Sequence, residues 1–174
     1  MKLLSESEGI RRLSRIRESL RQQIRAGYEY RAKDCLTCEV QGACCTDAHF
    51  VNVHITRLEA VAIRQTLDCL PDEQRNAVRA RASDAVSRYG LDAEGDTFSK
   101  TFACPLFEKG TGCLVHSTAK PLPCVSHACY ANAADLPPEE LLAGHEREVD
   151  DLNRRVYGSS QQWLPLPLAL ERRR

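Results

Sequence analysis

A chain of 174 residues is long enough to bury one hydrophobic core but short for two, and its zero net charge and ordinary apolar content fit a single globular domain. No run approaches the roughly 18 apolar residues of a membrane span, and the N-terminus lacks an apolar segment of signal-peptide length. We therefore expect a cytoplasmic protein with no membrane contact. Its nine cysteines need a chemical reason, because cytosolic thiols bind metal or do redox work more often than they form disulfides.

The charge is unevenly distributed along the chain. Residues 1–33 carry nine Lys and Arg against four Glu, whereas the rest carries fifteen against twenty Asp and Glu. A basic segment can bind nucleic-acid phosphates. Here acids interleave with the arginines and no aromatic stripe accompanies them, so the pattern favours a solvated helix face, or contact with a protein partner, over nucleic acid.

The N-terminal segment predicts one long amphipathic helix. Ser5 and Glu8 have the spacing of a capping box. Apolar residues then recur at steps of three and four: Ile10, Leu13, Ile16, Leu20 and Ile24. This helix is expected to run to about Tyr28 or Tyr30.

A short strand and two helices are predicted next. Residues 50–55, FVNVHI, are rich in β-branched side chains, as in strands. Thr56 and Glu59 repeat the capping box, so a second helix should start there and end before Pro71. Pro71 suits the start of a third helix, which would stop at Gly90.

The rest of the chain predicts an irregular segment, a last helix and a tail. Residues 91–130 are rich in turn residues, and TFACPLF and GCLVH are expected to pair as a hairpin that brings Cys104 near Cys113. A last helix follows and ends at Gly158. Its expected apolar face consists of Leu141, Leu142, His145, Val149, Leu152 and Val156. The tail over 163–174, with its prolines and terminal arginines, is expected to be a loosely packed extension.

These elements predict a mostly α fold with small β elements (α+β), in which a helical scaffold surrounds irregular, metal-stapled cysteine segments. The expected organisation is an N-terminal amphipathic helix over 1–33, a cysteine-cluster metal-binding domain over 34–133, and a C-terminal helix and tail over 134–174 that pack on the same domain.

Eight cysteines fall in two irregular segments, one around residues 35–45 and the other within residues 91–130. CLTCEVQGACC holds Cys35 and Cys38, a Cys-x-x-Cys pair whose turn can aim two sulfurs at one ion, and the adjacent Cys44 and Cys45. Neighbouring side chains of an extended chain point to opposite sides, so the adjacent pair is expected to serve two metal positions or opposite sides of a cluster. The second segment adds Cys104, Cys113, Cys124 and Cys129. Eight thiols suit two four-cysteine sites, or one cluster with thiols to spare.

Two further residues that could bind metal, Cys69 and His127, are interpreted as non-ligands. Cys69 lies outside both segments at a helix end, and we expect a small buried apolar side chain there. His127 has a ring nitrogen that can bind metal. Because eight thiols already suffice for two sites, a place beside the ligands or in solvent is favoured for His127.

Several separated pieces resemble one family. CLTCEVQGACC, FVNVHITRLEA, FACPLF, GCLVH and KPLPCVSHAC are similar to the CxxCxxCC family, also called YkgJ-type, of zinc- or iron-chelating cysteine cluster proteins. The resemblance spans about Cys35 to Cys129 and implies a metal-chelating bacterial cytosolic protein with the eight cysteines as ligands. Two departures stand out: five residues separate Cys38 from Cys44 where the family name has two, and Lys120 replaces the usual arginine.

The residues leave the metal open. Thiolates suit zinc and iron–sulfur clusters alike. Eight thiolates on two zinc ions would carry about −4, and Lys100, Lys109 and Lys120 lie close enough in sequence to offset it. Cys104-Pro105 is similar to the Cys-Pro of bacterial ferredoxins, so iron–sulfur or iron is slightly favoured over zinc, although the remaining ferredoxin spacing is absent.

Three functions follow as expectations. The first is a metal-binding protein of the cysteine cluster family that transfers electrons or handles metal, since some relatives are described as iron–sulfur proteins. The second is an interaction module folded by structural zinc, with the basic first helix contacting a protein partner. The third is an iron-dependent enzyme that modifies a protein or peptide, because a related domain occurs in flagellin lysine methylases. No GxGxxG, Walker or HExxH motif occurs, so no catalytic residue is assigned.

Overall fold

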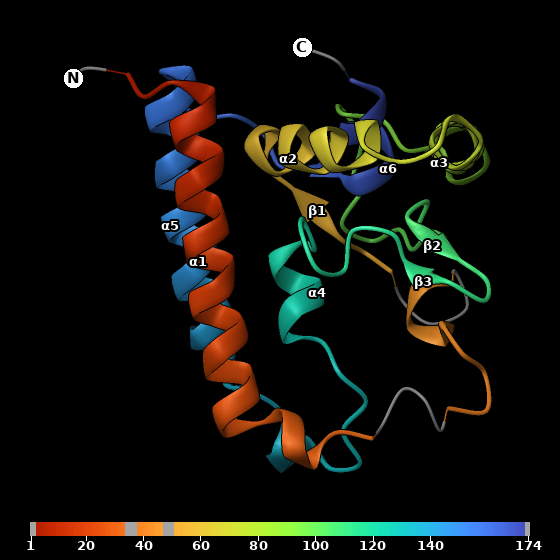
Figure 1. Ribbon diagram of the computed structural model, residues 1–174, viewed down its shortest axis with the longest axis vertical. Coiled ribbons are helices and arrows are strands. Elements are labelled where there is room, and N and C mark those ends of the chain that lie inside the picture. Colours follow the sequence, from red (N-terminus) through yellow and green to blue (C-terminus); the bar gives the residue numbers. More distant parts are fainter. Residues whose placement is uncertain (1–2, 34–37, 47–50, 173–174) are drawn as a thin grey trace. The chain divides into compact units, whose positions relative to one another are not determined.

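A computed structural model describes residues 3–33, 38–46 and 51–172. It is mostly helical with a few short antiparallel strands (Figure 1), which confirms the predicted fold class. None of the described helices has the length and apolar character needed to cross a membrane. The chain separates into two compact units, each made of two segments. Unit 1 comprises Met1–Gln41 and Lys120–Gln161, and unit 2 comprises Gly42–Ala119 and Gln162–Arg174.

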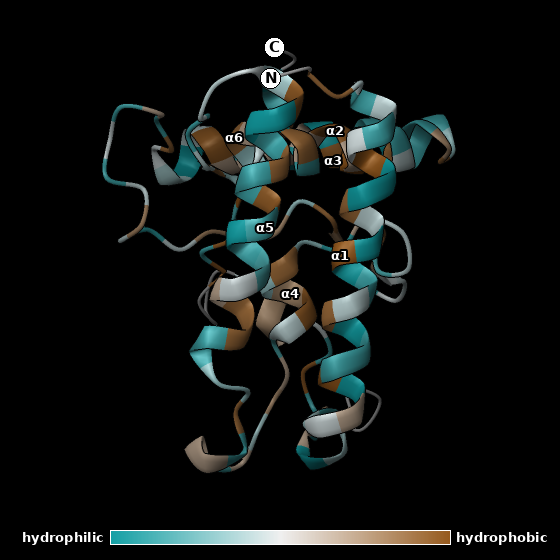
Figure 2. Ribbon diagram, turned by 90° about the vertical axis from the view of Figure 1, so that its left-hand side faces the viewer, coloured by the Kyte–Doolittle hydropathy of each residue, from teal (hydrophilic) through white to brown (hydrophobic). Residues whose placement is uncertain are grey.

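Unit 1 is built on two long helices, α1 (Glu6–Gly27) and α5 (Glu139–Tyr157), which lie side by side in Figure 2. They are antiparallel, because the N–H of Leu4, just before α1, donates to the carbonyl of Arg155 near the end of α5 at 3.0 Å. The short helix α4 (Leu122–Ser126), which the sequence did not predict, contacts both.

The interior of unit 1 comes from the predicted apolar faces. Figure 2 shows brown residues recurring along both long helices. The buried side chains follow the expected spacing: Leu13, Leu20 and Ile24 on α1, and His145, Val149, Leu152 and Val156 on α5. Burying a leucine or valine side chain contributes about 1.5–3 kcal/mol of folding free energy, so these buried side chains hold α1 and α5 together. The single turns η1 (Glu29–Arg31) and η5 (Ala133–Asp135) complete the unit.

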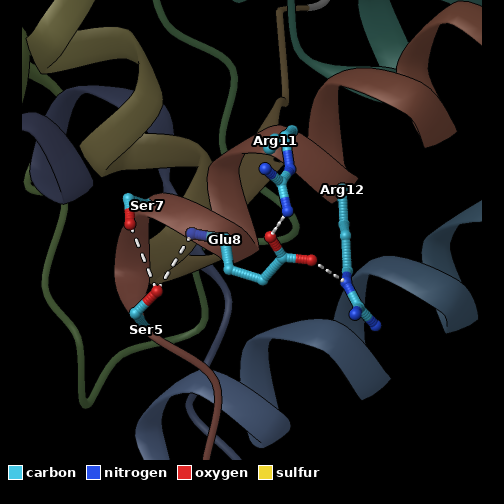
Figure 3. Close-up of polar contacts among 5 residues, drawn as sticks. All are labelled: Ser5, Ser7, Glu8, Arg11 and Arg12. Atoms are coloured by element: carbon cyan, nitrogen blue, oxygen red, sulfur yellow. Dashed lines mark hydrogen bonds and ion pairs between the residues drawn. The ribbon is translucent and has the colours of Figure 1, made fainter.

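The N-terminus of α1 shows half of the predicted capping box. The hydroxyl of Ser5 accepts a hydrogen bond from the N–H of Glu8 at 3.3 Å and lies 3.2 Å from the hydroxyl of Ser7 (Figure 3). The Glu8 carboxylate pairs instead with Arg11 and, at 2.6 Å, with Nε of Arg12. This hydrogen bond from Arg12 is the main cause that lowers the pKa of Glu8.

Unit 2 contains the helices α2 (Arg57–Asp68), α3 (Asp72–Tyr89) and α6 (Leu166–Glu171). The capping box that starts α2 is complete, as predicted. The hydroxyl of Thr56 accepts the N–H of Glu59 at 3.2 Å, and the Glu59 carboxylate accepts the N–H of Thr56 at 2.9 Å. These two reciprocal bonds satisfy backbone donors that the helix itself cannot pair.

Two antiparallel strand pairs complete unit 2. Strand β1 (His54–Ile55) pairs with β4 (Leu164–Pro165), and β2 (Phe107–Glu108) pairs with β3 (Gly112–Cys113). The strand predicted over 50–55 is therefore shorter than expected, and its first residue lies outside the described part. The apolar core includes fully buried side chains from several segments: Ile55, Leu58, Ile63, Phe102, Leu106 and Leu166.

The prediction of a loose C-terminal tail was wrong. Leu164 lies opposite Ile55 in the β1–β4 pair, and α6 packs on α2 and α3 with Leu166 and Ala169 buried. Proline at the start of a helix costs little, because the first N–H groups have no helical partner. The prolines of this segment thus stand at the start of a helix, with Pro165 as its N-cap.

Candidate metal centre

The adjacent cysteines lie in a tight turn. Cys44 and Cys45 close the 3-10 helix η3 (Ala43–Cys45), and their sulfurs are 4.0 Å apart. The expectation that they point to opposite sides rested on an extended backbone, and the helical turn overturns it. The corners of a tetrahedral site with zinc–sulfur bonds of ~2.3 Å are about 3.8 Å apart. One ion can therefore be shared by this pair.

The predicted hairpin brings two more thiols to this turn. The N–H of Cys104 donates to the carbonyl of Cys45 at 2.9 Å, which ties the two segments together. Cys113 lies opposite Phe107 in the β2–β3 pair. The prediction of a hairpin between TFACPLF and GCLVH is confirmed.

The electrostatics of Cys45 show that the four thiols interact. A hydrogen bond with the Cys104 side chain, burial, and the repulsion from Cys104 and Cys113 raise the pKa of Cys45 to about 12, although Cys44 opposes this rise. Without metal the Cys45 thiol therefore keeps its proton at neutral pH. A bound metal would displace that proton, since only the thiolate is a ligand.

Gly42 and Phe107 position the turn on the hairpin, and the sequence analysis missed both. Gly42 precedes η3 with φ 80°, in the left-handed region that favours glycine. A Cβ at this position would overlap the ring of Phe107. The ring thus lies directly over the Gly42 backbone, and Phe107 is the strand partner of Cys113. The available signal was the glycine just before the adjacent cysteines.

The remaining predicted ligands belong to unit 1. Cys38 and Cys129 are exposed, and Cys124 is half-buried on α4. The N–H of Lys33 donates to the carbonyl of Cys129 at 2.8 Å. Cys35 lies outside the described residues. The described cysteines thus divide by unit, with Cys38, Cys124 and Cys129 in unit 1 and Cys44, Cys45, Cys104 and Cys113 in unit 2.

Cys69 and His127, which the sequence analysis interpreted as non-ligands, are both exposed. Cys69 is exposed at the C-terminal cap of α2, where its thiol lies 3.5 Å from the carbonyl of Gln65, so the expected burial was wrong. The helix simply ends with that face toward solvent. The His127 side chain is exposed, and partial desolvation of its ring and the Lys120 ammonium lower its pKa.

The three lysines proposed to offset thiolate charge have different surroundings. Lys100 donates to the carbonyl of Gly90 at 2.5 Å, at the end of α3. Lys109 is exposed in the loop of the hairpin, and Lys120 belongs to unit 1.

The described cysteines are all free thiols. Among the described residues, no three His, Cys, Asp or Glu side chains already converge as a metal site. Protonated thiols have no central charge to draw them inward, so contacts between pairs are the arrangement expected before binding. The donor set of unit 2, four soft sulfurs on two linked loops, fits a thiophilic metal in type and number.

Comparison with known proteins adds no relative: no family model, no curated protein and no solved structure matches this chain.

Proposed function

We propose that the chain is a cytoplasmic metal-binding protein whose unit 2 holds a thiophilic ion with Cys44, Cys45, Cys104 and Cys113. The observation that carries this proposal is the 4.0 Å approach of the Cys44 and Cys45 sulfurs in a turn that the Cys104 N–H bonds through the Cys45 carbonyl. Around these thiols the backbone is largely irregular, and metal ligation is a common substitute for a missing apolar core. The resemblance to the zinc- or iron-chelating cysteine cluster family supports the same function.

A single ion, zinc or iron, is the occupant we favour for unit 2. In a four-iron cluster each thiolate binds a different iron, so the cysteine sulfurs lie farther apart than the corners of one tetrahedron. The 4.0 Å between the sulfurs of Cys44 and Cys45 suits one tetrahedron. An iron–sulfur cluster, slightly favoured from the sequence, is the competing occupant, and its two-iron form would also place two thiolates on one iron.

The thiols of unit 1 are proposed as a second set of ligands. Cys38, Cys124 and Cys129 belong to this unit, and Cys35 joins them in sequence. That three described thiols belong to a different unit from Cys44, Cys45, Cys104 and Cys113 supports a set of ligands of its own. Two metal ions per chain is therefore the stoichiometry we expect.

A second candidate function is a protein-interaction module that zinc folds. It is favoured by a groove of about 380 Å³ between α1 and α5, lined by Arg12, Arg15 and Arg155 as well as two carboxylates and two apolar side chains. Such a mixed surface suits a protein partner better than nucleic acid. An iron-dependent modifying enzyme, the third expectation, gains no observation here.

The metal proposal is tested by analysing protein purified under anaerobic conditions without an affinity tag. We expect zinc or iron at about two per chain, and Cys44→Ser and Cys104→Ser to lose about one ion each, because a structural tetrathiolate site does not tolerate a missing ligand. Cys69→Ser is the matched control and should keep both. Comparable amounts of iron and acid-labile sulfide would instead establish a cluster. Equal metal content in all variants, or none in the wild type, would contradict the proposal.

A further inference from the structure

One arginine of α3 reaches the loop that carries a predicted ligand. Nε of Arg81 donates to the carbonyl of Pro105 at 2.9 Å, and Pro105 directly follows Cys104. A second contact lies nearby: Nε2 of Gln74 donates to the carboxylate of Glu108 at 3.0 Å. Helix α3 is therefore joined at two points to the hairpin segment of unit 2.

Arg81 has hydrogen-bonding capacity that the described residues leave unused. Its Nη2 atom is buried and has no hydrogen-bond acceptor among them, and no carboxylate pairs with its guanidinium. A guanidinium stays charged at any ordinary pH. A buried cationic N–H without an acceptor is destabilising, so such a group is normally placed where an anion forms.

The metal site is the anion that unit 2 would form. Four thiolates on a divalent ion leave a charge of about −2, which is costly to hold in a half-buried loop without cations or N–H donors nearby. Lys100 is engaged at the end of α3 and Lys109 is exposed in the hairpin loop. Arg81, by contrast, is part-buried and bonded to the residue that follows Cys104.

We propose that Arg81 is a positioning residue of the metal site: it holds the Cys104 loop through the Pro105 carbonyl and offsets the charge of the metal-bound thiolates. This inference rests on the proposed function, since the anion exists only when metal is bound. It assigns to α3 a role that the cysteine pattern does not contain. The expected ligand remains a divalent metal ion, and Arg81 does not bind it directly.

The test compares Arg81→Met, Arg81→Lys and the control Arg79→Met, an exposed arginine of the same helix. Each metal-free full-length protein is titrated with Co²⁺ under anaerobic conditions, with visible absorption as readout. We expect Arg81→Met to weaken Co²⁺ binding at the unit 2 site by about tenfold or more and to shift its sulfur-to-cobalt absorption band. Arg81→Lys should recover most of the affinity because it keeps the charge, and Arg79→Met should match the wild type.

Unfolding of the metal-free proteins separates this role from simple packing. Arg81→Met loses the hydrogen bond to the Pro105 carbonyl together with a half-buried cation whose Nη2 lacks an acceptor, so metal-free stability should fall much less than metal affinity. A loss of metal-free stability that matches the loss of affinity, or no rescue by lysine, would overturn the charge role. If the wild type binds Co²⁺ and Arg81→Met binds it equally well, this inference fails and the proposed function stands. If the wild type binds no Co²⁺, both fail.

Discussion

Gly42 decides how closely the adjacent cysteines approach the hairpin. Gly42→Ala places a methyl group in the ring of Phe107, and either the turn or the strand must move. We expect a loss of about 1–3 kcal/mol of stability together with loss of metal from unit 2. Metal content per chain and denaturant unfolding measure both effects.

Gly110→Ala is the matched control for this change. Gly110 also has a positive φ, 85°, but its added Cβ would meet no atom within 4 Å. The alanine there should carry only the backbone cost of about 1 kcal/mol and retain metal. Equal metal retention in the two variants would show that the approach of Phe107 to Gly42 is unimportant.

His54 should make unit 2 sensitive to acid. Its ring is buried, with Nε2 2.8 Å from the hydroxyl of Thr97 and its face stacked on Phe98 at 3.9 Å. Burial lowers the pKa of His54 below its usual 6.5, against a smaller opposing effect of the Asn52 carbonyl. The unfolded chain therefore binds a proton first as pH falls through about 6.5, and the folded state loses stability below that pH.

The variant His54→Gln isolates this contribution. The free energy of unfolding of metal-free protein, compared at about pH 7.5 and about pH 5.5, should fall further for the wild type than for the glutamine variant. An equal fall in both proteins would mean that other groups set the acid response.

At the scale of elements, α6 should contribute to the core rather than trail from it. Leu166 is 1% exposed, so Leu166→Ala should cost about 2–5 kcal/mol of unfolding free energy, because it leaves a cavity. Leu136, which is 52% exposed, provides the control, and Leu136→Ala should change stability by about 0.5 kcal/mol or less. Similar small losses in both variants would restore the prediction of a loose tail.

The elements that the sequence predicted well are those with local signals. Thr56 and Glu59 fix the start of α2 through bonds between neighbours in the chain, and Gly90 ends α3 in the left-handed conformation, φ 59°. The partner of β1 lies more than a hundred residues away, in Leu164–Pro165. Nothing local to that segment marks it as a strand.

At the scale of the whole molecule, metal removal should affect the two units differently. Unit 1 has a seam of buried side chains along α1 and α5 that does not depend on metal, whereas the cysteine turn and hairpin of unit 2 have little regular structure. After removal of metal with a chelator, amide hydrogen exchange should rise most in residues 42–46 and 102–116. The amides of α1 and α5 should keep most of their protection. Uniform loss of protection would show that the units fold as one.

The amino-acid sequence by itself determined the helical class, the apolar faces of the long helices, the hairpin and the eight candidate ligands. These follow from periodicity, caps and residue chemistry, which act between near neighbours. Only the tertiary structure decided that Cys44 and Cys45 share a turn, that the backbone of Gly42 lies under the ring of Phe107, and that Arg81 reaches the Pro105 carbonyl. Such contacts join segments far apart in the chain, and they form only when the surrounding backbone has packed.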